Sequence, residues 1–247
     1  MRALVLAVAG WMLAGPAWAA GMADCQQEKN PDLAIKSCTA IVKNTKETAA
    51  NRALAYFYRG VANAAKRKYD DAIADYTAAV KLNPADAQSY NNRGNLYDRK
   101  GDNGRALADY SKAIQANPQY GLAYSNRCWS YYLAGDFAHA LADCNQALSL
   151  NPKNSHALDS RCAAYIGLKK YDQAIKDCGQ AIALDPNYGY PYFHRGDALY
   201  RKGQPKPALA DFQMAQRLIP KGNAEYQAKV QSRISDIQAG KPAPSSP

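Results

Sequence analysis

The sequence lacks any long apolar run beyond its first twenty residues. No later segment could cross a bilayer as a helix, which excludes a multi-span membrane protein. Glycine and proline are also sparse, at 16 and 13 of 247 residues, and this excludes collagen and an extended low-complexity chain. Because 47% of the residues are apolar, the chain has enough apolar surface for one large core or a linear array.

The sequence also lacks the short motifs that accompany common catalytic and metal chemistry. It contains no Gly-rich phosphate loop, no Gly-x-Ser-x-Gly and no His-Glu-x-x-His. No Cys-x-x-Cys occurs, and His139, His156 and His194 lack paired metal-ligand spacing. We therefore expect no enzyme, no cofactor and no metal, although a catalytic site assembled from several segments would leave no such motif.

The N-terminal segment has the pattern of a secretory signal peptide. Arg2 precedes an apolar stretch from Ala3 to Leu13, and the small-residue pattern Ala17-Trp18-Ala19 follows. We expect residues 1–20 to be removed on export, with a retained membrane anchor as the alternative. The mature protein is then expected to be periplasmic or secreted, without a transmembrane segment.

Five prolines recur at intervals of 34 residues, and the same interval carries columns of arginine, alanine and aspartate. Such a period indicates an internal repeat. Five units follow one another between residues 53 and 222 without an insertion: 53–86, 87–120, 121–154, 155–188 and 189–222. The arginines are Arg59, Arg93, Arg127, Arg161 and Arg195, and the aspartates are Asp75, Asp109, Asp143, Asp177 and Asp211.

Within each unit the apolar positions follow a helical period twice. In the second unit, Tyr90, Gly94 and Tyr97 share one face, and a new helical face begins after the break at Gly101-Asp102. Asn-Pro or Asp-Pro then ends the second helix, because proline cannot continue it. Each unit is therefore expected to be a pair of helices.

These columns resemble the tetratricopeptide repeat (TPR) family. The match is to its helix-turn-helix unit of 34 residues, with large, small and aromatic residues at fixed columns and a final proline. It departs from the family at Asn63 and Leu199, where tyrosine is usual, and at the cysteines. The resemblance implies an all-α fold, an α-solenoid of stacked hairpins, and a protein that binds proteins or peptides.

In a helical hairpin, a residue of the first helix faces the residue of the second helix that lies equally far beyond the turn. The positions of two facing residues within the unit therefore have a constant sum. This relation pairs each repeat arginine with the aspartate of the same unit, so we expect five structural ion pairs. It also places Gly60 opposite Tyr76, and the small residue lets the two helices approach closely.

Six cysteines in an exported chain indicate disulfides, with a zinc site or a redox pair as the alternatives. In two units, cysteine replaces both members of the facing glycine–aromatic pair, and the two remaining cysteines flank a turn at Asn30-Pro31. The predicted pairs are Cys128 with Cys144, Cys162 with Cys178, and Cys25 with Cys38.

A stack of repeats needs end caps, because one unit cannot bury its own apolar face. Residues 21–52 are expected to form a degenerate, shortened hairpin and a linker. Residues 223–239 are expected to form a capping helix with Tyr226 and Val230 on its apolar face. Residues 240–247 hold three prolines and two serines and are expected to be disordered.

In a TPR solenoid the outward columns of the first helices line a concave groove, which here is aromatic and amide-rich. Tryptophan and tyrosine are enriched at binding hot spots, and asparagine can bond an extended peptide backbone; packing between neighbouring helices is the alternative. Asn95 and Asn126 match the amides of the family's carboxylate clamp, but its cationic positions are not cationic here. The candidate groove residues are Tyr58, Asn92, Asn95, Asn126, Trp129, Tyr132, His156, Phe193, His194 and Tyr200.

The formal net charge is +10, and many of the cations fall at the hairpin turns. They are Lys66, Arg67, Lys68, Arg99, Lys100, Lys169, Lys170, Arg201 and Lys202. A solvated edge is one interpretation, and attraction to an anionic partner is the other. We expect a protein-interaction adaptor or scaffold, with binding of an anionic envelope polymer or membrane surface as the alternative. Nucleic acid is not expected outside the cytoplasm.

Overall fold

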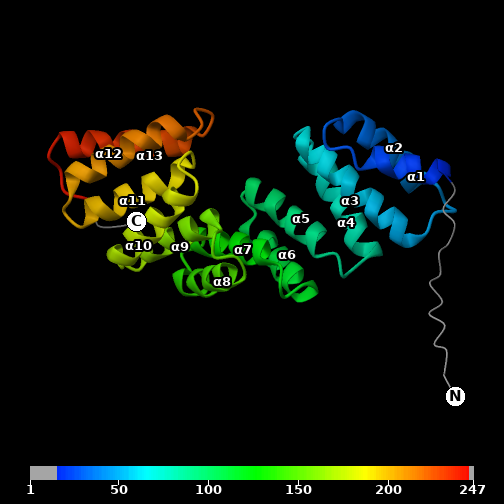
Figure 1. Cartoon of the computed structure of the whole chain (residues 1–247), viewed down its shortest axis with the longest axis horizontal. Coiled ribbons are helices and arrows are strands. Elements are labelled where there is room, and N and C mark those ends of the chain that lie inside the picture. Colours follow the sequence, from blue (N-terminus) through cyan, green and yellow to red (C-terminus); the bar gives the residue numbers. More distant parts are fainter. Residues whose placement is uncertain (1–15, 245–247) are drawn as a thin grey trace, which may run out of the picture. The chain divides into compact units, whose positions relative to one another are not determined.

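The computed structural model describes residues 16–244, with side chains from residue 21 onwards. This part of the chain forms helices and no strand (Figure 1), which confirms the all-α repeat fold. Residues 1–15 of the expected signal peptide and residues 245–247 of the expected tail lie outside it. The helices are α1 (Pro16–Cys25), α2 (Pro31–Lys43), α3 (Ala49–Ala65), α4 (Tyr69–Leu82), α5 (Ala87–Arg99), α6 (Asn103–Ala116), α7 (Gly121–Leu133), α8 (Phe137–Leu150), α9 (Ser155–Gly167), α10 (Tyr171–Leu184), α11 (Gly189–Arg201), α12 (Pro205–Leu218) and α13 (Ala224–Gln238).

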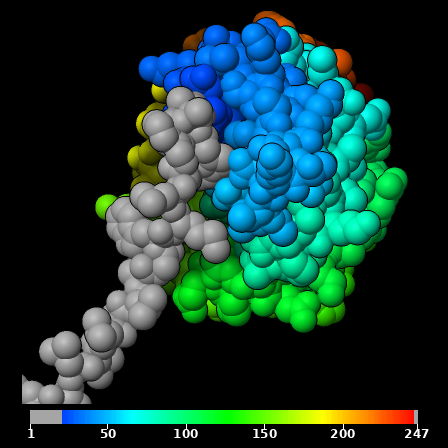
Figure 2. Space-filling view, turned by 90° about the vertical axis from the view of Figure 1, so that its right-hand side faces the viewer, coloured from blue at the N-terminus to red at the C-terminus, as the bar shows by residue number. Residues whose placement is uncertain are grey.

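The chain divides into two compact units, Met1–Ser89 and Tyr90–Pro247. The first unit contains α1 to α4 and the second α6 to α13, while α5 spans the boundary. In the space-filling view of Figure 2, residues of the first unit, in blue to cyan, face the viewer. In the second unit, α7 packs on α8, α9 on α10 and α11 on α12 (Figure 1). No helix of the described residues is both long enough and apolar enough to span a membrane.

Every repeat closes its hairpin with one residue of positive φ, and these residues stand 34 positions apart. They are Arg67, Gly101, Gly135, Lys169 and Gly203, with φ between 58° and 78°. The amide that follows the turn residue donates to the carbonyl five residues earlier, as Lys170 N does to Tyr165 O at 2.8 Å. This Schellman closure ends the first helix and starts the second within three residues.

The expected ion pairs form in all five repeats. The shortest nitrogen–oxygen distance is 2.6 or 2.7 Å in each pair, and each aspartate is buried. Repeat arginines also reach the preceding hairpin: Arg59 Nη1 donates to Thr39 Oγ1 at 3.1 Å, Arg127 Nη1 to Ser111 Oγ at 2.9 Å, and Arg161 Nη1 to Asn145 Oδ1 at 2.8 Å. These arginines therefore join neighbouring hairpins as well as the two helices of their own repeat.

The helix α13 covers the last hairpin. Its Val230 and Ile234 are buried against Phe212 and Tyr192, in one cluster with the apolar residues of α11 and α12. This is the arrangement expected of a capping helix, because the last repeat has no following neighbour to bury its apolar face.

The segment after α13 differs from the expected disordered tail. Ala243 packs against the apolar cluster of α11 to α13, and the carbonyls of Lys241 and Pro244 accept hydrogen bonds from side chains of α11. Composition alone suggested that these residues could not pack. They are held by these two hydrogen bonds, by the Ala243 contact and by an ion pair between Lys241 and Asp236 at 3.1 Å. The prolines do not prevent this, because their carbonyls can still accept hydrogen bonds.

Candidate functional site

The inner face of the second unit is formed by side chains of the first helices α5, α7, α9 and α11, some of them half-buried and some buried. It consists of Asn91, Asn92, Asn95, Asp98, Asn126, Trp129, Tyr132, Asp159 and His194. Amides occupy its α5 end: Asn126 Nδ2 donates to Asn91 Oδ1 at 2.9 Å, and Asn95 Oδ1 accepts from Tyr110 OH at 2.7 Å. Asn92 and Asn126 remain half-buried, so part of this amide row faces solvent.

Asp98 lies beside the amide row and is only half satisfied. Its Oδ2 accepts from Tyr110 OH at 2.8 Å and from Ser130 Oγ at 2.7 Å. Its Oδ1 is buried and has no hydrogen-bond partner among the described residues. Burial raises the pKa of the Asp98 carboxyl above its usual value, against the opposing effect of the two hydrogen bonds. The inner face therefore carries an acidic group that ionises less readily than usual.

An aromatic cluster occupies the other end of the inner face. The rings of Trp129 and Tyr132 lie 5.0 Å apart, and that of Trp129 lies 6.2 Å from the ring of His194. Tyr226 of α13 reaches the same cluster, 6.3 Å from His194. Burial is the main cause that raises the pKa of Tyr132 to about 12. Side chains of α7, α11 and α13 thus converge in one aromatic cluster, in which Trp129 and Tyr132 remain half-buried.

Asp159 of α9 anchors this cluster. Its Oδ1 lies 2.7 Å from His194 Nδ1, and its Oδ2 accepts from Tyr188 OH at 3.2 Å. The side chains of Asp159 and His194 are each 3% exposed. His194 Nε2 is buried without a hydrogen-bond partner among the described residues. The pair is closed to solvent and ties α9 to α11.

Three expected groove residues are part of the core. Phe193, His194 and Tyr200 are buried, and Phe193 packs against the rings of Phe212 and Tyr226. Their column position is that of an open groove, but side chains of α12 and α13 and the segment after α13 cover them. His156 remains exposed, with its ring 4.5 Å from that of Tyr188.

Tyr58 belongs to the first unit. It is half-buried, with its ring 5.1 Å from that of Phe57. It is therefore not part of the inner face of the second unit.

The hairpin turns are not uniformly basic. Lys66 forms an ion pair with Asp32, and Lys202 with Asp172. Arg201 is not an edge residue: its side chain is only 4% exposed and is paired with Asp197 at 2.6 Å. The remaining cations of the predicted edge are exposed: Arg67 and Lys68 in the first unit, and Arg99, Lys100, Lys169 and Lys170 in the second.

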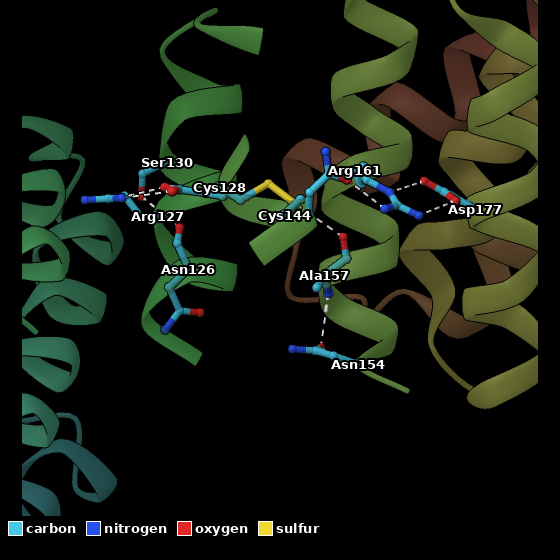
Figure 3. The surroundings of a disulfide bond; sticks show 11 residues. Asn126, Arg127, Cys128, Ser130, Cys144, Asn154, Ala157, Arg161 and Asp177 are labelled. Carbon is cyan, nitrogen blue, oxygen red and sulfur yellow. Dashed lines mark hydrogen bonds and ion pairs between the residues drawn. A yellow bond between two sulfur atoms is a disulfide. The ribbon is translucent and has the colours of Figure 1, made fainter. Parts of the chain in front are cut away.

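The structure joins the predicted cysteine pairs: Cys25–Cys38, Cys128–Cys144 and Cys162–Cys178. Figure 3 shows the Cys128–Cys144 bond between α7 and α8, between the Arg127 and Arg161 side chains.

The Cys178 sulfur, the Asp159 carboxylate and the His194 ring offer donor atoms that all lie within 4.8 Å of one another. The disulfide occupies the Cys178 sulfur, so no thiolate is present and this group does not fit a metal ion in the oxidised protein.

Comparison with known proteins agrees with the architecture. Sequence profiles described as "Tetratricopeptide repeat" match residues 87–120 and 121–154, and a profile described as "TPR repeat" matches residues 60–101 and 163–203. The chain belongs to the TPR family. No curated protein matches the sequence of this TPR protein.

Several solved structures share the fold of this TPR protein. A tetratricopeptide repeat protein from Parabacteroides merdae ATCC 43184 is 19% identical in sequence. The match covers 91% of this chain and 93% of that protein, with a TM-score of 0.70. YrrB, described as a TPR protein with an unusual peptide-binding site, is 20% identical over 79% and 98%, with a TM-score of 0.59. MamA is 21% identical over 72% and 94%, with a TM-score of 0.57.

Proposed function

We propose that this TPR protein is an exported adaptor or scaffold that binds a peptide or helical segment of another protein along the inner face of its second unit. The observation that carries the proposal is the row of half-buried side chains on α5 and α7, Asn92, Asn126, Trp129 and Tyr132. Ring faces supply apolar contact area, and amides supply donors and acceptors for a peptide backbone. The fold that this chain shares with YrrB, whose printed description names a peptide-binding site, supports the same role.

The proposed role is binding and not catalysis. The one histidine–carboxylate pair of the inner face, His194 with Asp159, is closed to solvent on both sides. A general base must reach the proton that it removes from a substrate. Half-buried rings and amides can contact a ligand without such a group.

Export is part of the proposal. The signal-like N-terminal sequence supports it, and so do the six cysteines, because all of them are paired within the described residues. The experiment is to express the full chain, determine the N-terminus of the product in the envelope fraction, and count its thiols. We expect a new N-terminus near residue 20 and no reactive thiol. An intact N-terminus with six thiols would contradict export.

Partner binding is tested by affinity capture from native envelope extract with the mature oxidised protein. A Trp129→Ala/Tyr132→Ala variant removes the proposed contacts. Tyr131→Ala is the matched control, because Tyr131 also lies on α7 but stacks against His139, 5.2 Å away. We expect a protein that the parent and the control retain at high salt and that the double variant loses.

The same capture tests the basic hairpin turns. Contacts made by exposed charges are screened over about 8 Å at physiological ionic strength, so binding at the turns should be lost early in a salt gradient. Recovery of only salt-labile anionic material, equally by all three proteins, would overturn the inner-face proposal in favour of the turns. The pairing of Lys66 and Lys202 and the burial of Arg201 make the turns the weaker candidate.

A further inference from the structure

At the C-terminal end of α11, the fold holds a short extended segment of its own chain, residues 241–244. After α13, Gly240 adopts a positive φ of 66° and the chain turns back. Residues 241–244 have no helical structure and lie against the C-terminal end of α11. Tyr200 OH donates to the Lys241 carbonyl at 2.5 Å, and Arg201 Nη1 donates to the Pro244 carbonyl at 2.8 Å. Two consecutive residues of α11 therefore hold both ends of this segment.

Both donors are covered when residues 241–244 are in place, and Asp197 also holds Arg201. Tyr200 and the Arg201 side chain are each 4% exposed. Asp197 Oδ2 accepts from Arg201 Nε at 2.6 Å, while Asp197 Oδ1 accepts from Arg233 Nε at 3.0 Å. Two guanidinium groups thus share the Asp197 carboxylate, and Arg201 Nη1 remains directed at the Pro244 carbonyl. The second acid of this corner, Asp236, pairs with Lys241 at 3.1 Å. Such a corner favours a ligand that offers oxygen acceptors.

The bound segment has matching chemistry. Its sequence is Lys-Pro-Ala-Pro, in which the two prolines offer carbonyl acceptors but no backbone N–H. Proline also restricts the unbound backbone to extended conformations, so less entropy is lost on binding. Ala243 provides the small apolar contact with the cluster around Tyr200.

The segment leaves space beside it. A pocket of about 470 Å³ is lined by Tyr200, Arg201, Gly203, Pro205 and Ile237 together with residues 240–243. A segment that filled its site completely would leave no such volume. The pocket therefore gives an incoming peptide a place to contact before residues 241–244 leave.

We propose that Tyr200, Arg201 and this pocket form a subsite for an extended, proline-containing segment of a partner protein, and that residues 241–244 are its internal occupant. The subsite is separate from the Trp129 and Tyr132 contacts of the proposed function, so either proposal can fail alone. A tethered segment acts at an effective concentration of about millimolar. Residues 241–244 therefore keep weak ligands out and admit only a segment that binds more tightly or in several places.

The test is a titration with the synthetic peptide Gly-Lys-Pro-Ala-Pro, blocked at both ends, followed by NMR of the oxidised protein. We compare the full chain with a chain that ends at Gly240. The shortened chain is expected to bind the peptide saturably and at least about tenfold more tightly than the full chain, because its own segment no longer competes. A peptide with alanine at both proline positions is expected to bind at least about fivefold more weakly.

Two further variants locate the binding. Arg201→Lys in the shortened chain keeps a cation but loses the planar fork, and it should weaken peptide binding about tenfold. Because Arg201 is buried, its replacement could disturb the fold, so a second variant leaves its ion pairs intact. This variant, Pro242→Gly/Pro244→Gly in the full chain, loosens the internal segment and should raise the affinity for the peptide. Lys206→Ala, an exposed change on α12, serves as the matched control.

Equal affinity of the full and shortened chains would overturn the proposal. So would the absence of saturable binding to the shortened chain at 10 mM peptide, about ten times the effective concentration of the tether. Binding to the shortened chain that Arg201→Lys leaves unchanged would place the peptide elsewhere and would also overturn it. None of these outcomes depends on whether the Trp129→Ala/Tyr132→Ala variant loses its partner in the affinity capture, so the two proposals are tested separately.

Discussion

The Tyr110 ring stands where a side chain on Gly94 would have to lie. A Cβ added to Gly94 would come within 2.8 Å of Tyr110 Cε1. The same relation joins Gly60 to Tyr76 and Gly196 to Phe212, while the two remaining repeats place a disulfide at these positions. One gap between the two helices of a hairpin is thus filled in two ways, by a ring against a glycine or by a covalent bond.

This close approach predicts the effect of Gly94→Ala. The added methyl overpacks the hairpin, so we expect the free energy of unfolding to fall by about 1–3 kcal/mol. Gly179→Ala is the control, because its nearest neighbour, Arg195 Nη1, would lie 3.9 Å from the new Cβ. That change removes a flexible residue from the interior of α10 and should raise stability by about 0.5–1 kcal/mol. Urea unfolding measures the free energy of unfolding of both variants. An equal change in the two variants would show that the contact with Tyr110 does not determine the effect of Gly94→Ala.

The two ways of filling the gap should be interchangeable. Removing one disulfide by Cys128→Ala/Cys144→Ala is expected to cost about 3 kcal/mol of stability, through lost cross-linking and an empty gap. The swap Cys128→Gly/Cys144→Phe copies the Gly196–Phe212 repeat, and it should unfold at higher urea than the double alanine variant because the ring refills the gap. A swap no more stable than the double alanine variant would contradict this view. Phenylalanine is chosen over tyrosine because a tyrosine hydroxyl here would need an acceptor such as Asn95, which bonds Tyr110. The position equivalent to Asn95 in this repeat holds Trp129, which offers no acceptor.

The period of 34 residues made most of the hairpin predictable from sequence. A fixed period aligns facing positions by arithmetic, so Arg127 with Asp143 and Cys128 with Cys144 could be paired without knowing the curvature of the stack. These contacts lie within one hairpin. Their geometry depends on the two helices and their short turn.

Contacts between repeats were less predictable. The column of His194 identifies the face of α11 on which it lies, but not that Trp129, two repeats earlier, and Tyr226 of α13 close over it. Arg201 was assigned to the turn edge from its neighbours along the chain. It shares the Asp197 carboxylate with Arg233, and it donates to the Pro244 carbonyl, 43 residues away. Such contacts depend on how much each repeat rotates on the next, which the period does not contain.

The positive-φ turn predicts a stabilising substitution. Lys169 holds a φ of 58°, a conformation that costs an L-residue about 1–2 kcal/mol and glycine much less. Lys169→Gly should therefore raise the free energy of unfolding by about 0.5–1 kcal/mol, after the entropy cost of glycine. The reciprocal change Gly135→Lys, at a φ of 78°, should lower it by about the same amount. Lys170→Gly, where φ is −90°, is the control; an equal gain there would mean that charge and not backbone conformation is responsible.

The half-satisfied Asp98 predicts a pH dependence of stability. Burial raises the pKa of this carboxyl above its ordinary 3.8, so between that value and the folded pKa the folded protein holds more protons than the unfolded chain. The contribution of Asp98 is then most favourable at low pH and is lost as the pH rises through the folded pKa. Asparagine cannot ionise, and its Oδ1 can still accept from Tyr110 or Ser130. The stability of Asp98→Asn relative to the parent should therefore increase between pH 4 and pH 7.

Asp102 offers a control of opposite sign four residues further along. The side-chain hydrogen bond from Arg105 is the main cause that lowers the pKa of the Asp102 carboxyl, so its contribution is present above the ordinary pKa and is lost as the pH falls. Asp102→Asn should consequently lose stability relative to the parent at pH 7 and lose less at pH 3. Urea unfolding of the parent and both variants across this range gives the two slopes. A flat profile for Asp98→Asn would mean that Asp98 titrates like an exposed carboxyl whose unpartnered Oδ1 is reached by solvent, and a slope parallel to that of Asp102→Asn would mean that its pKa is lowered.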